Sequence, residues 1–154
     1  MTDKADERRS RLTRRLTESV ERLLADGGQY SDLSVETLIN DAGISRYTFY
    51  AYYRDKGDLL AAIGADVTLD LAQAGARWFE FPTDGTRADL RTALQPLFRT
   101  YRRHRTVLGA IAETAAYDPR IRDVHSALVA RAAAGLREQI VDAQRAGAAA
   151  PELR

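Results

Sequence analysis

The hydrophobic positions of the chain repeat with the period of an α-helix from its first residues onward. Near the N-terminus the apolar residues recur every three or four positions, at Leu12, Leu16, Val20, Leu23 and Leu24. This spacing places their side chains on one face of a helix. The sequence "DGG" at residues 26–28 follows, and glycine is typical just after a helix ends. The pattern therefore predicts an N-terminal helix that stops before the glycine pair.

Two short helices are predicted next, with a glycine between them. Ser34 is a suitable N-cap for the first of them, and Leu33 and Leu38 occupy the two hydrophobic-staple positions. Gly43 can end this helix because glycine adopts positive φ at little cost. Ser45 is a suitable N-cap for the helix that follows. Two short helices joined by a tight turn that contains glycine form the helix-turn-helix pattern.

The remaining chain predicts four longer helices. The first covers about residues 55–80, with Asp55 as its cap and a stripe at Leu60, Ile63, Val67, Leu71, Ala74 and Trp78. The sequence "FPTDG" at residues 81–85 ends it, and Thr86 with Asp89 starts the next helix through a capping-box pattern. Pro96 lies inside that helix. Helices over about 106–116 and 118–147 complete the chain, and no strand-like alternation occurs.

The fold class that follows is all-α, with seven helices in two parts. Residues 1–56 would form a three-helix head with a helix-turn-helix, and residues 57–154 would form an antiparallel helical body. With 154 residues, 45% of them hydrophobic, the chain is long enough and apolar enough for a packed core.

Composition restricts the possible functions. The formal net charge is +1, so nucleic-acid binding would depend on local placement of charge. The absence of cysteine excludes disulfides, cysteine-based zinc sites and thiol nucleophiles. The N-terminal sequence "MTDKADERRSRL" does not have a signal-peptide pattern, and no apolar run is long enough to span a membrane. We therefore expect a cytoplasmic protein without a membrane partner.

Arginines gather in the predicted first helix, at Arg8, Arg9, Arg11, Arg14 and Arg15. Two interpretations remain open. The cluster is either a solvated start of a helix or a basic arm that contacts phosphates.

The predicted third helix carries an excess of tyrosine, at Tyr47, Tyr50, Tyr52 and Tyr53. Packing is the alternative for any single ring, but one short helix cannot bury all four. Helical spacing turns Phe49 and Tyr53 inward and leaves Arg46, Tyr47 and Tyr50 on another side, with Thr48 and Tyr52 on a third. Arginine can bind guanine or phosphate, and hydroxyls can donate to phosphate oxygens. Lys56, at the start of the next helix, also suits a phosphate.

At this point the sequence resembles a known family. Residues 33–63, "LSVETLINDAGISRYTFYAYYRDKGDLLAAI", are similar to the DNA-binding signature of the tetracycline-repressor family. The matching positions are Ala42, Gly43, Ile44, Ser45, Thr48, Phe49, Tyr50, Tyr52, Lys56, Leu59 and Leu60. Three features depart from the signature. Tyr53 stands where phenylalanine is usual, Arg54 and Asp55 replace the common Pro-Ser, and the acidic Glu36 lies near the start of the second helix.

The resemblance implies a dimeric transcriptional regulator, usually a repressor, that binds a palindromic double-stranded DNA operator and is released by a small-molecule effector. It also implies roles for individual residues. Those facing bases would be Ser45, Arg46, Tyr47 and Ala51. Those facing phosphates would be Ser34, Thr48, Tyr50, Tyr52 and Lys56. Family members usually end with two further helices that form the dimer. The chain is therefore incomplete, dimerises otherwise or is a short form, and these alternatives stay open.

The predicted body contains no recognisable catalytic constellation, so we expect neither an enzyme nor a cofactor or metal. His104 stands among arginines, which favours a solvated or phosphate-near residue, whereas His125 suits a core or a pocket. Candidate ligand-binding residues on facing helices are Trp78, Leu94, Phe98, Tyr101, Leu108, Ile111, His125 and Leu128. A filled core is the alternative for each of them, and the family resemblance favours a pocket for an apolar ligand.

Three functions compete at this stage. The leading hypothesis is a ligand-responsive, operator-binding repressor. The second is a small-molecule-binding protein whose head lacks operator affinity, which Glu36 and the low net charge favour. A helical enzyme ranks last.

Overall fold

The computed structural model describes residues 2–82 and 84–152. Within these residues it contains eight α-helices and one 3-10 turn, η1, and no β-strand, which confirms the all-α class. Residue 83, within the predicted break at 81–85, lies outside the described residues. Two compact units, each with its own packing, divide the chain at points inside helices α4 and α8. The predicted boundary after residue 56 stays a prediction.

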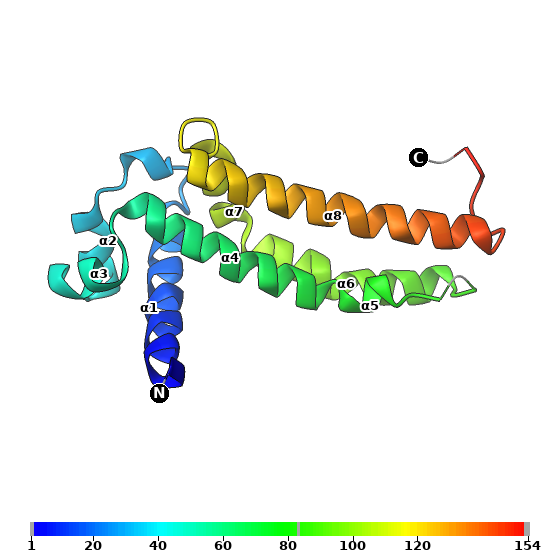
Figure 1. Cartoon of the computed structure of the whole chain (residues 1–154), viewed down its shortest axis with the longest axis horizontal. Coiled ribbons are helices and arrows are strands. Elements are labelled where there is room, and N and C mark those ends of the chain that lie inside the picture. The colour runs from blue at the N-terminus through cyan, green and yellow to red at the C-terminus, as the bar shows by residue number, and fades with distance from the viewer. Residues whose placement is uncertain (1, 83, 153–154) are drawn as a thin grey trace. The chain divides into compact units, whose positions relative to one another are not determined.

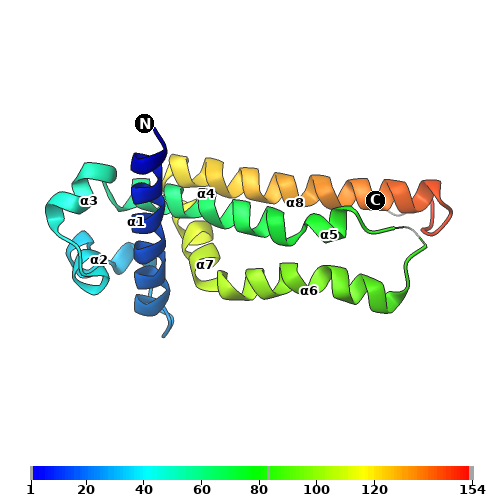
Figure 2. The ribbon, with the colours of Figure 1, turned by 90° about the horizontal axis from the view of Figure 1, so that it is seen from below.

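Unit 1 comprises residues 2–67 and 104–125. Its elements are α1 (Thr2–Leu23), η1 (Tyr30–Asp32), α2 (Val35–Ala42), α3 (Arg46–Tyr52), the first part of α4 (Lys56–Ala74), α7 (Arg105–Thr114) and the start of α8 (Pro119–Arg145). Helix α1 packs against both α2 and α7, and Figures 1 and 2 show α2 and α3 together beside α1. The fully buried core of the unit includes Leu16, Leu38, Phe49, Leu60, Ile63, Ile111 and Ile121.

The turn between α2 and α3 forms as the sequence predicts. Ser34 caps α2 by accepting a hydrogen bond from the backbone N–H of Thr37 at 3.0 Å. Gly43 ends α2 with φ of 63°, and the N–H of Ile44 donates to the carbonyl of Ile39 at 3.0 Å. This is the Schellman arrangement, in which the residue after the glycine satisfies a terminal carbonyl of the helix. Arg15 of α1 donates to the carbonyl of Ala42 at 2.6 Å, so one member of the arginine cluster fixes this turn.

Close approach of three helices in unit 1 depends on a glycine that the hydrophobic pattern did not single out. Gly64 of α4 is buried, and a Cβ placed there would lie 2.7 Å from the Val124 side chain of α8. The same Cβ would lie 3.3 Å from the Ile111 side chain of α7. The missing side chain therefore lets α4, α7 and α8 share one core.

His104 corrects one expectation. It was predicted to be solvated or near phosphate, but only 5% of the residue is exposed in unit 1. Its Nδ1 atom lies 3.4 Å from Oε1 of Glu21, a residue of α1. His104 occupies the turn before α7, which directs it toward α1 while the neighbouring Arg103 and Arg105 remain exposed. Sequence neighbours alone do not reveal this direction.

Unit 2 comprises the end of α4, α5 (Ala76–Phe79), α6 (Arg87–Arg103) and residues 126–152, which include the rest of α8. The predicted helix through Trp78 is wrong at its end, because α4 stops at Ala74 and α5 is a separate eighth helix. Gly75 lies between them, and the N–H of Trp78 donates to its carbonyl at 2.9 Å, which is a 3-10 spacing. Glycine is a weak helix former, and this permits the change. The predicted capping box of α6 is confirmed, since Asp89 accepts from the N–H of Thr86 at 3.0 Å.

Helix α8 approaches α5 closely within unit 2. Gly135 is buried, and a Cβ at this position would collide with the ring of Phe79. Gln139, one turn further along, donates from Nε2 to the carbonyl of Phe79 at 2.8 Å. A glycine and a side-chain amide therefore join α5 to α8.

Candidate nucleic-acid interface

Helix α3 has one buried side and one exposed side, as its spacing predicts. Phe49 and Tyr53 are 0% and 1% exposed, which confirms that both face the core. Tyr47 is 85% exposed and Tyr50 is 47% exposed. The exposed side also carries Arg46 and Ala51. Helix α3 therefore presents one cation and two phenols to the outside, on a base of buried aromatic rings.

Contacts with neighbouring side chains orient Tyr50. Its ring meets the ring of Phe49 edge to face, with centroids 5.2 Å apart and planes at 82°. The guanidinium carbon of Arg46 lies 5.8 Å from the centre of the Tyr50 ring, one helical turn away. Edge-to-face and cation–π contacts of this kind restrict the positions of the groups involved. The exposed hydroxyl of Tyr50 is thus carried on a partly fixed ring.

The N-caps of α2 and α3 have the same local arrangement. Ser45 accepts from the N–H of Thr48 at 3.0 Å, and the two hydroxyl oxygens lie 2.9 Å apart. Ser34 forms the equivalent pair with Thr37, whose hydroxyl oxygen lies 2.8 Å from its own. Ser34 and Ser45 are exposed, whereas Thr48 is half-buried. Each cap hydroxyl therefore fixes the start of a helix and remains accessible from outside.

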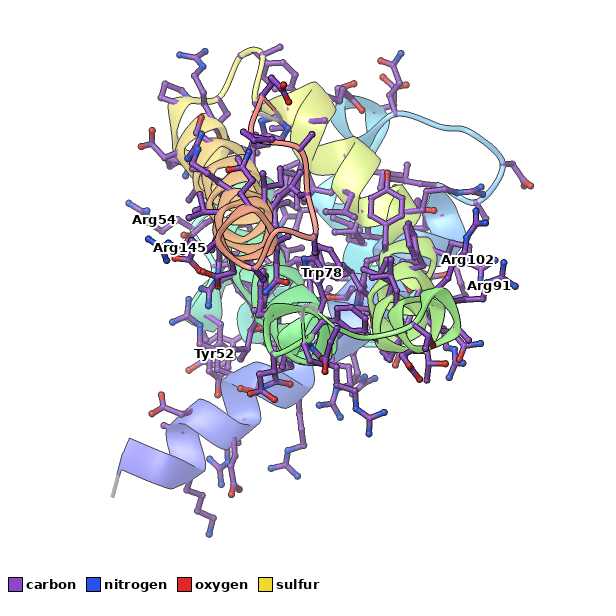
Figure 3. All side chains as sticks on the ribbon, turned by 90° about the vertical axis from the view of Figure 1, so that its right-hand side faces the viewer. Tyr52, Arg54, Trp78, Arg91, Arg102 and Arg145 are labelled. Carbon is purple, nitrogen blue, oxygen red and sulfur yellow. The ribbon has the colours of Figure 1, made fainter. Side chains whose placement is uncertain are left out.

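Tyr52 is half-buried at the end of α3, and its position among the side chains of unit 1 can be followed in Figure 3. Its predicted phosphate contact stays a prediction, as do the roles of the other residues on α3. Glu36 is exposed in the first turn of α2, so the acidic group that departs from the family pattern lies on the surface.

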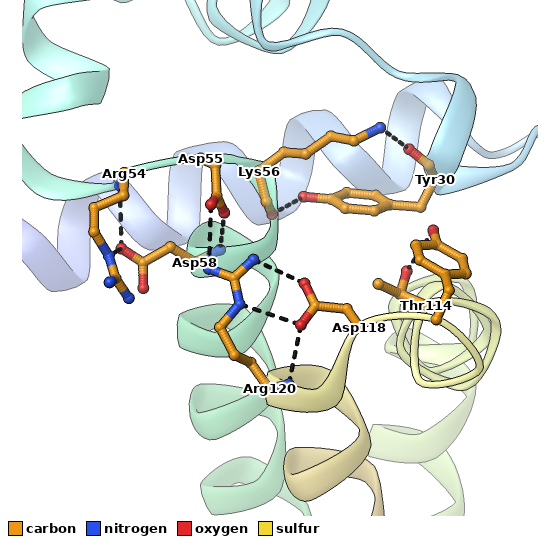
Figure 4. A network of polar contacts seen from close by, with 9 residues as sticks. Tyr30, Arg54, Asp55, Lys56, Asp58, Thr114, Asp118 and Arg120 are labelled. Atoms are coloured by element: carbon orange, nitrogen blue, oxygen red, sulfur yellow. Dashed lines mark hydrogen bonds and ion pairs between the residues drawn. The ribbon is translucent and has the colours of Figure 1, made fainter.

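Lys56 makes contacts that its sequence position did not suggest. Its Nζ atom donates to the carbonyls of Tyr30 at 3.0 Å, Ser31 at 2.6 Å and Leu33 at 2.9 Å. An ammonium group has three N–H donors, so these carbonyls use all of them. In this structure Lys56 holds the segment that leads into α2 (Figure 4). Its predicted contact with phosphate stays a prediction.

A second group of charges surrounds the start of α4. Arg120 of α8 donates to Oδ2 of Asp55 at 3.2 Å and to Oδ2 of Asp118 at 2.8 Å (Figure 4). Asp55 also accepts from the N–H of Asp58 at 2.8 Å, which confirms that it caps α4. The sequence suggested Asp55 as a cap, but it gave no signal that Arg120 would join it to Asp118.

These contacts lower the pKa of both aspartates. Hydrogen bonds from Arg120 hold the pKa of Asp118 below its usual range. The backbone N–H of Asp58, and then Arg120, do the same for Asp55. The carboxylates therefore remain charged at neutral pH.

The candidate ligand-binding residues divide between the two units. Leu108, Ile111 and His125 belong to unit 1, and Ile111 is buried there. The others belong to unit 2, and they are Trp78, Leu94, Phe98, Tyr101 and Leu128. Phe98 and Tyr101 are exposed on α6, the helix from which Arg91 and Arg102 project in Figure 3. Binding of a ligand by this set stays a prediction.

Neither a metal-binding cluster nor a membrane-spanning helix occurs in the part of the chain that the structure describes. No cluster of three or more His, Cys, Asp or Glu side chains in residues 4–82 and 84–152 could hold a metal ion. Among the described helices, none combines the length and hydropathy that crossing a bilayer requires.

Comparison with known proteins places the helix-turn-helix in a family. Residues 17–63 match the model of the tetR family of bacterial regulatory proteins. The chain is also 31% identical, over 134 residues, to the HTH-type transcriptional regulator EthR of Mycobacterium tuberculosis and to that of Mycobacterium bovis. These alignments cover 86% of this chain and 61% of each relative, so the chain spans about three fifths of their length. Residues 17–63 therefore form a domain of the kind found in the tetR family of bacterial regulatory proteins.

Proposed function

We propose that this chain is a DNA-binding transcriptional regulator. More specifically, we propose a repressor that binds a palindromic operator as a homodimer in the cytoplasm and is released by a small apolar ligand. The observation that carries the proposal is the division of α3, with Phe49 and Tyr53 buried and with Arg46, Tyr47 and Tyr50 exposed. The family membership of residues 17–63 supports the same function.

The chemistry of the exposed residues suits a duplex. A helix-turn-helix lays its second helix in the major groove, where arginine can bind guanine through O6 and N7. We assign this role to Arg46, with Ser45, Tyr47 and Ala51 beside it. Hydroxyl groups position a protein by donating to phosphate oxygens. We assign that role to Ser34, Thr48, Tyr50 and Tyr52.

The effector and the dimer rest on the family alone. We propose an apolar ligand for the residues around Trp78 and Tyr101, and a homodimer because palindromic operators require two recognition helices about 34–36 Å apart.

One observation favours a second candidate function. Glu36 is exposed at the start of α2, where a carboxylate would repel phosphate. A helical protein that binds small molecules without binding an operator would tolerate this acid.

A selection experiment separates the two candidates. The chain is used to select duplexes from a randomised pool, and the affinity for the selected duplex is compared with that for a scrambled one at several salt concentrations. We expect sequence-dependent binding that weakens steeply with salt. Equal, weak affinity for both duplexes at low salt would exclude the regulator.

Variants then assign the residues. Arg46→Ala should reduce the preference for the selected duplex by about 1–3 kcal/mol, whereas Tyr50→Phe should weaken binding to both duplexes alike. Arg137→Ala, which removes an exposed arginine from α8, is the matched control for the charge. Tyr117→Phe, at an exposed ring outside the helix-turn-helix, is the control for the phenol.

A further inference from the structure

The short turn η1 is held at both ends by charged side chains from other helices. Glu113 of α7 accepts from the backbone N–H of Tyr30 at 3.1 Å through Oε2 and from that of Ser31 at 3.3 Å through Oε1. The carboxylate thus satisfies two N–H groups at the start of η1. The carbonyls of the same segment are bound by Lys56, as described above. A carboxylate therefore holds the N–H side of the turn, and an ammonium holds its carbonyl side.

Tyr30 fixes the turn to the protein interior. Its side chain is buried, and its hydroxyl donates to the carbonyl of Lys56 at 2.6 Å. The Nζ atom of Lys56 also lies 5.5 Å from the centre of the Tyr30 ring. Tyr30 and Lys56 therefore bind each other in both directions, each donating to a carbonyl of the other (Figure 4).

The helix that supplies Glu113 is itself anchored. Val107, Ala110, Ile111 and Thr114 of α7 are all buried in unit 1, while Glu113 reaches from the same helix to η1. Interiors are closely packed, so α7 offers a fixed point from which the carboxylate acts. The position of η1 is consequently set by α7 on one side and by the first residue of α4 on the other.

The turn in question leads directly into the helix-turn-helix. Leu33 alone separates η1 from Ser34, the N-cap of α2. Any displacement of η1 would therefore move Ser34 and the first turn of α2. Hydrogen bonds to a charged carboxylate or ammonium are among the stronger ones in proteins, so removing Glu113 would free two N–H groups from a charge-assisted contact.

We propose that Glu113 is a positioning residue for DNA binding, which acts with Lys56 to place η1 and thereby the start of α2. The inference rests on the proposed function as a DNA-binding regulator. Because Ser34 faces phosphate in that function, Glu113 governs affinity for any duplex rather than preference for one sequence. Glu113 itself makes no contact with DNA in this role.

The first test needs no DNA. Amide hydrogen exchange is measured on the full chain and on Glu113→Ala, and we expect the amides of Tyr30 and Ser31 to exchange faster in the variant. Glu138→Ala, which removes an exposed carboxylate from α8, is the matched control and should leave both amides unchanged. Unchanged exchange in Glu113→Ala would overturn the proposal.

The second test uses the duplex selected by the unmodified chain and its scrambled counterpart. We expect Glu113→Ala to bind both duplexes about tenfold more weakly, because one charge-assisted contact is lost. The ratio of the affinities for the two duplexes should not change. Glu113→Gln keeps one acceptor oxygen and should recover part of the loss.

A variant elsewhere in the core separates positioning from general loss of stability. Ile121→Val removes one methylene from a fully buried residue in the first turn of α8. It should lower the denaturant midpoint and leave DNA affinity unchanged at temperatures where both proteins are folded. If Ile121→Val weakens DNA binding as much as Glu113→Ala, or if Glu113→Ala binds both duplexes normally, the positioning role is overturned while the proposed function stands. If the unmodified chain selects no duplex, the proposed function and the positioning role are both overturned, whatever the result of the hydrogen-exchange measurement.

Discussion

The phenol oxygen of Tyr53 lies 2.6 Å from the hydroxyl oxygen of Thr13, and both residues are buried in unit 1. The Thr13 hydroxyl donates its single proton to the carbonyl of Arg9 at 2.9 Å, so Tyr53 is the donor in the pair. Burial raises the pKa of the Tyr53 phenol. The protonated hydroxyl therefore joins the residue after α3 to α1, at the position where the family signature usually has phenylalanine.

Tyr53→Phe should destabilise the chain by about 1 kcal/mol, because it leaves the buried Thr13 oxygen without a donor. The free energy of unfolding from urea titration is the measurement. DNA affinity should not change, since Tyr53 faces the core.

The double variant with Thr13→Val provides the control for this pair. It removes both partners, so its loss of stability should be smaller than the sum of the two single losses. Additive losses would show that the two hydroxyls do not stabilise each other.

The sequence predicted which side of α3 would be buried, because that division depends only on helical spacing. It could not predict the bond between Tyr53 and Thr13, since the two residues are 40 positions apart. The contacts of Lys56 could not be predicted from the sequence either. Its place in the first turn of a helix suggested a phosphate, but the fold brings three carbonyls of the η1 segment to its ammonium.

Local signals predicted the ends of helices well where a cap residue forms its own bonds. Ser34, Gly43, Ser45 and Asp55 all do so within a few residues of their position. The end of α4 was missed because the apolar stripe continues past Gly75 to Trp78, although the backbone changes there. The bridge through Arg120 was missed because Asp55 lies 65 positions away. Contacts between distant segments are a property of the packing, which periodicity does not contain.

Gly43→Ala should destabilise unit 1 by about 1–2 kcal/mol, because φ of 63° at this position is strained for a residue with a Cβ. The space itself is adequate, since the nearest atom to the added Cβ would be Arg15 Nη2 at 3.5 Å. Gly109→Ala, at an exposed position inside α7 with no atom within 4 Å of the added Cβ, is the matched control and should not destabilise. The measurement is the difference between the thermal unfolding midpoints of the two variants. Equal midpoints would show that alanine adopts the backbone conformation at position 43 without strain.

Gly57→Ala should break the bridge between Asp55 and Asp118. A Cβ on Gly57 would collide with the guanidinium of Arg120 and would lie 2.7 Å from Oδ2 of Asp118. We expect Arg120 to leave this position, with a loss of less than about 1 kcal/mol because the side chains of Arg120 and Asp55 are about half exposed. A double-mutant cycle with Arg120→Ala is the measurement. Once Arg120 is absent, Gly57→Ala should cost less, because the collision with the guanidinium is gone. The same cost in both backgrounds would contradict the predicted collision.

Acid should weaken the folded state through the same two carboxylates. The pKa of Asp118 and that of Asp55 are lowered in the folded chain, whereas an aspartate in an unfolded chain has a pKa of about 3.9. The stabilisation is therefore fully present above that value and is lost as the pH falls through the lower folded values. Asp118→Asn should reduce the loss of unfolding free energy between neutral pH and about pH 3. Asp123→Asn, at an exposed aspartate of α8, is the control and should retain the full loss. If Asp118→Asn is as acid-sensitive as the unmodified chain, then Arg120 does not link the stability of unit 1 to pH.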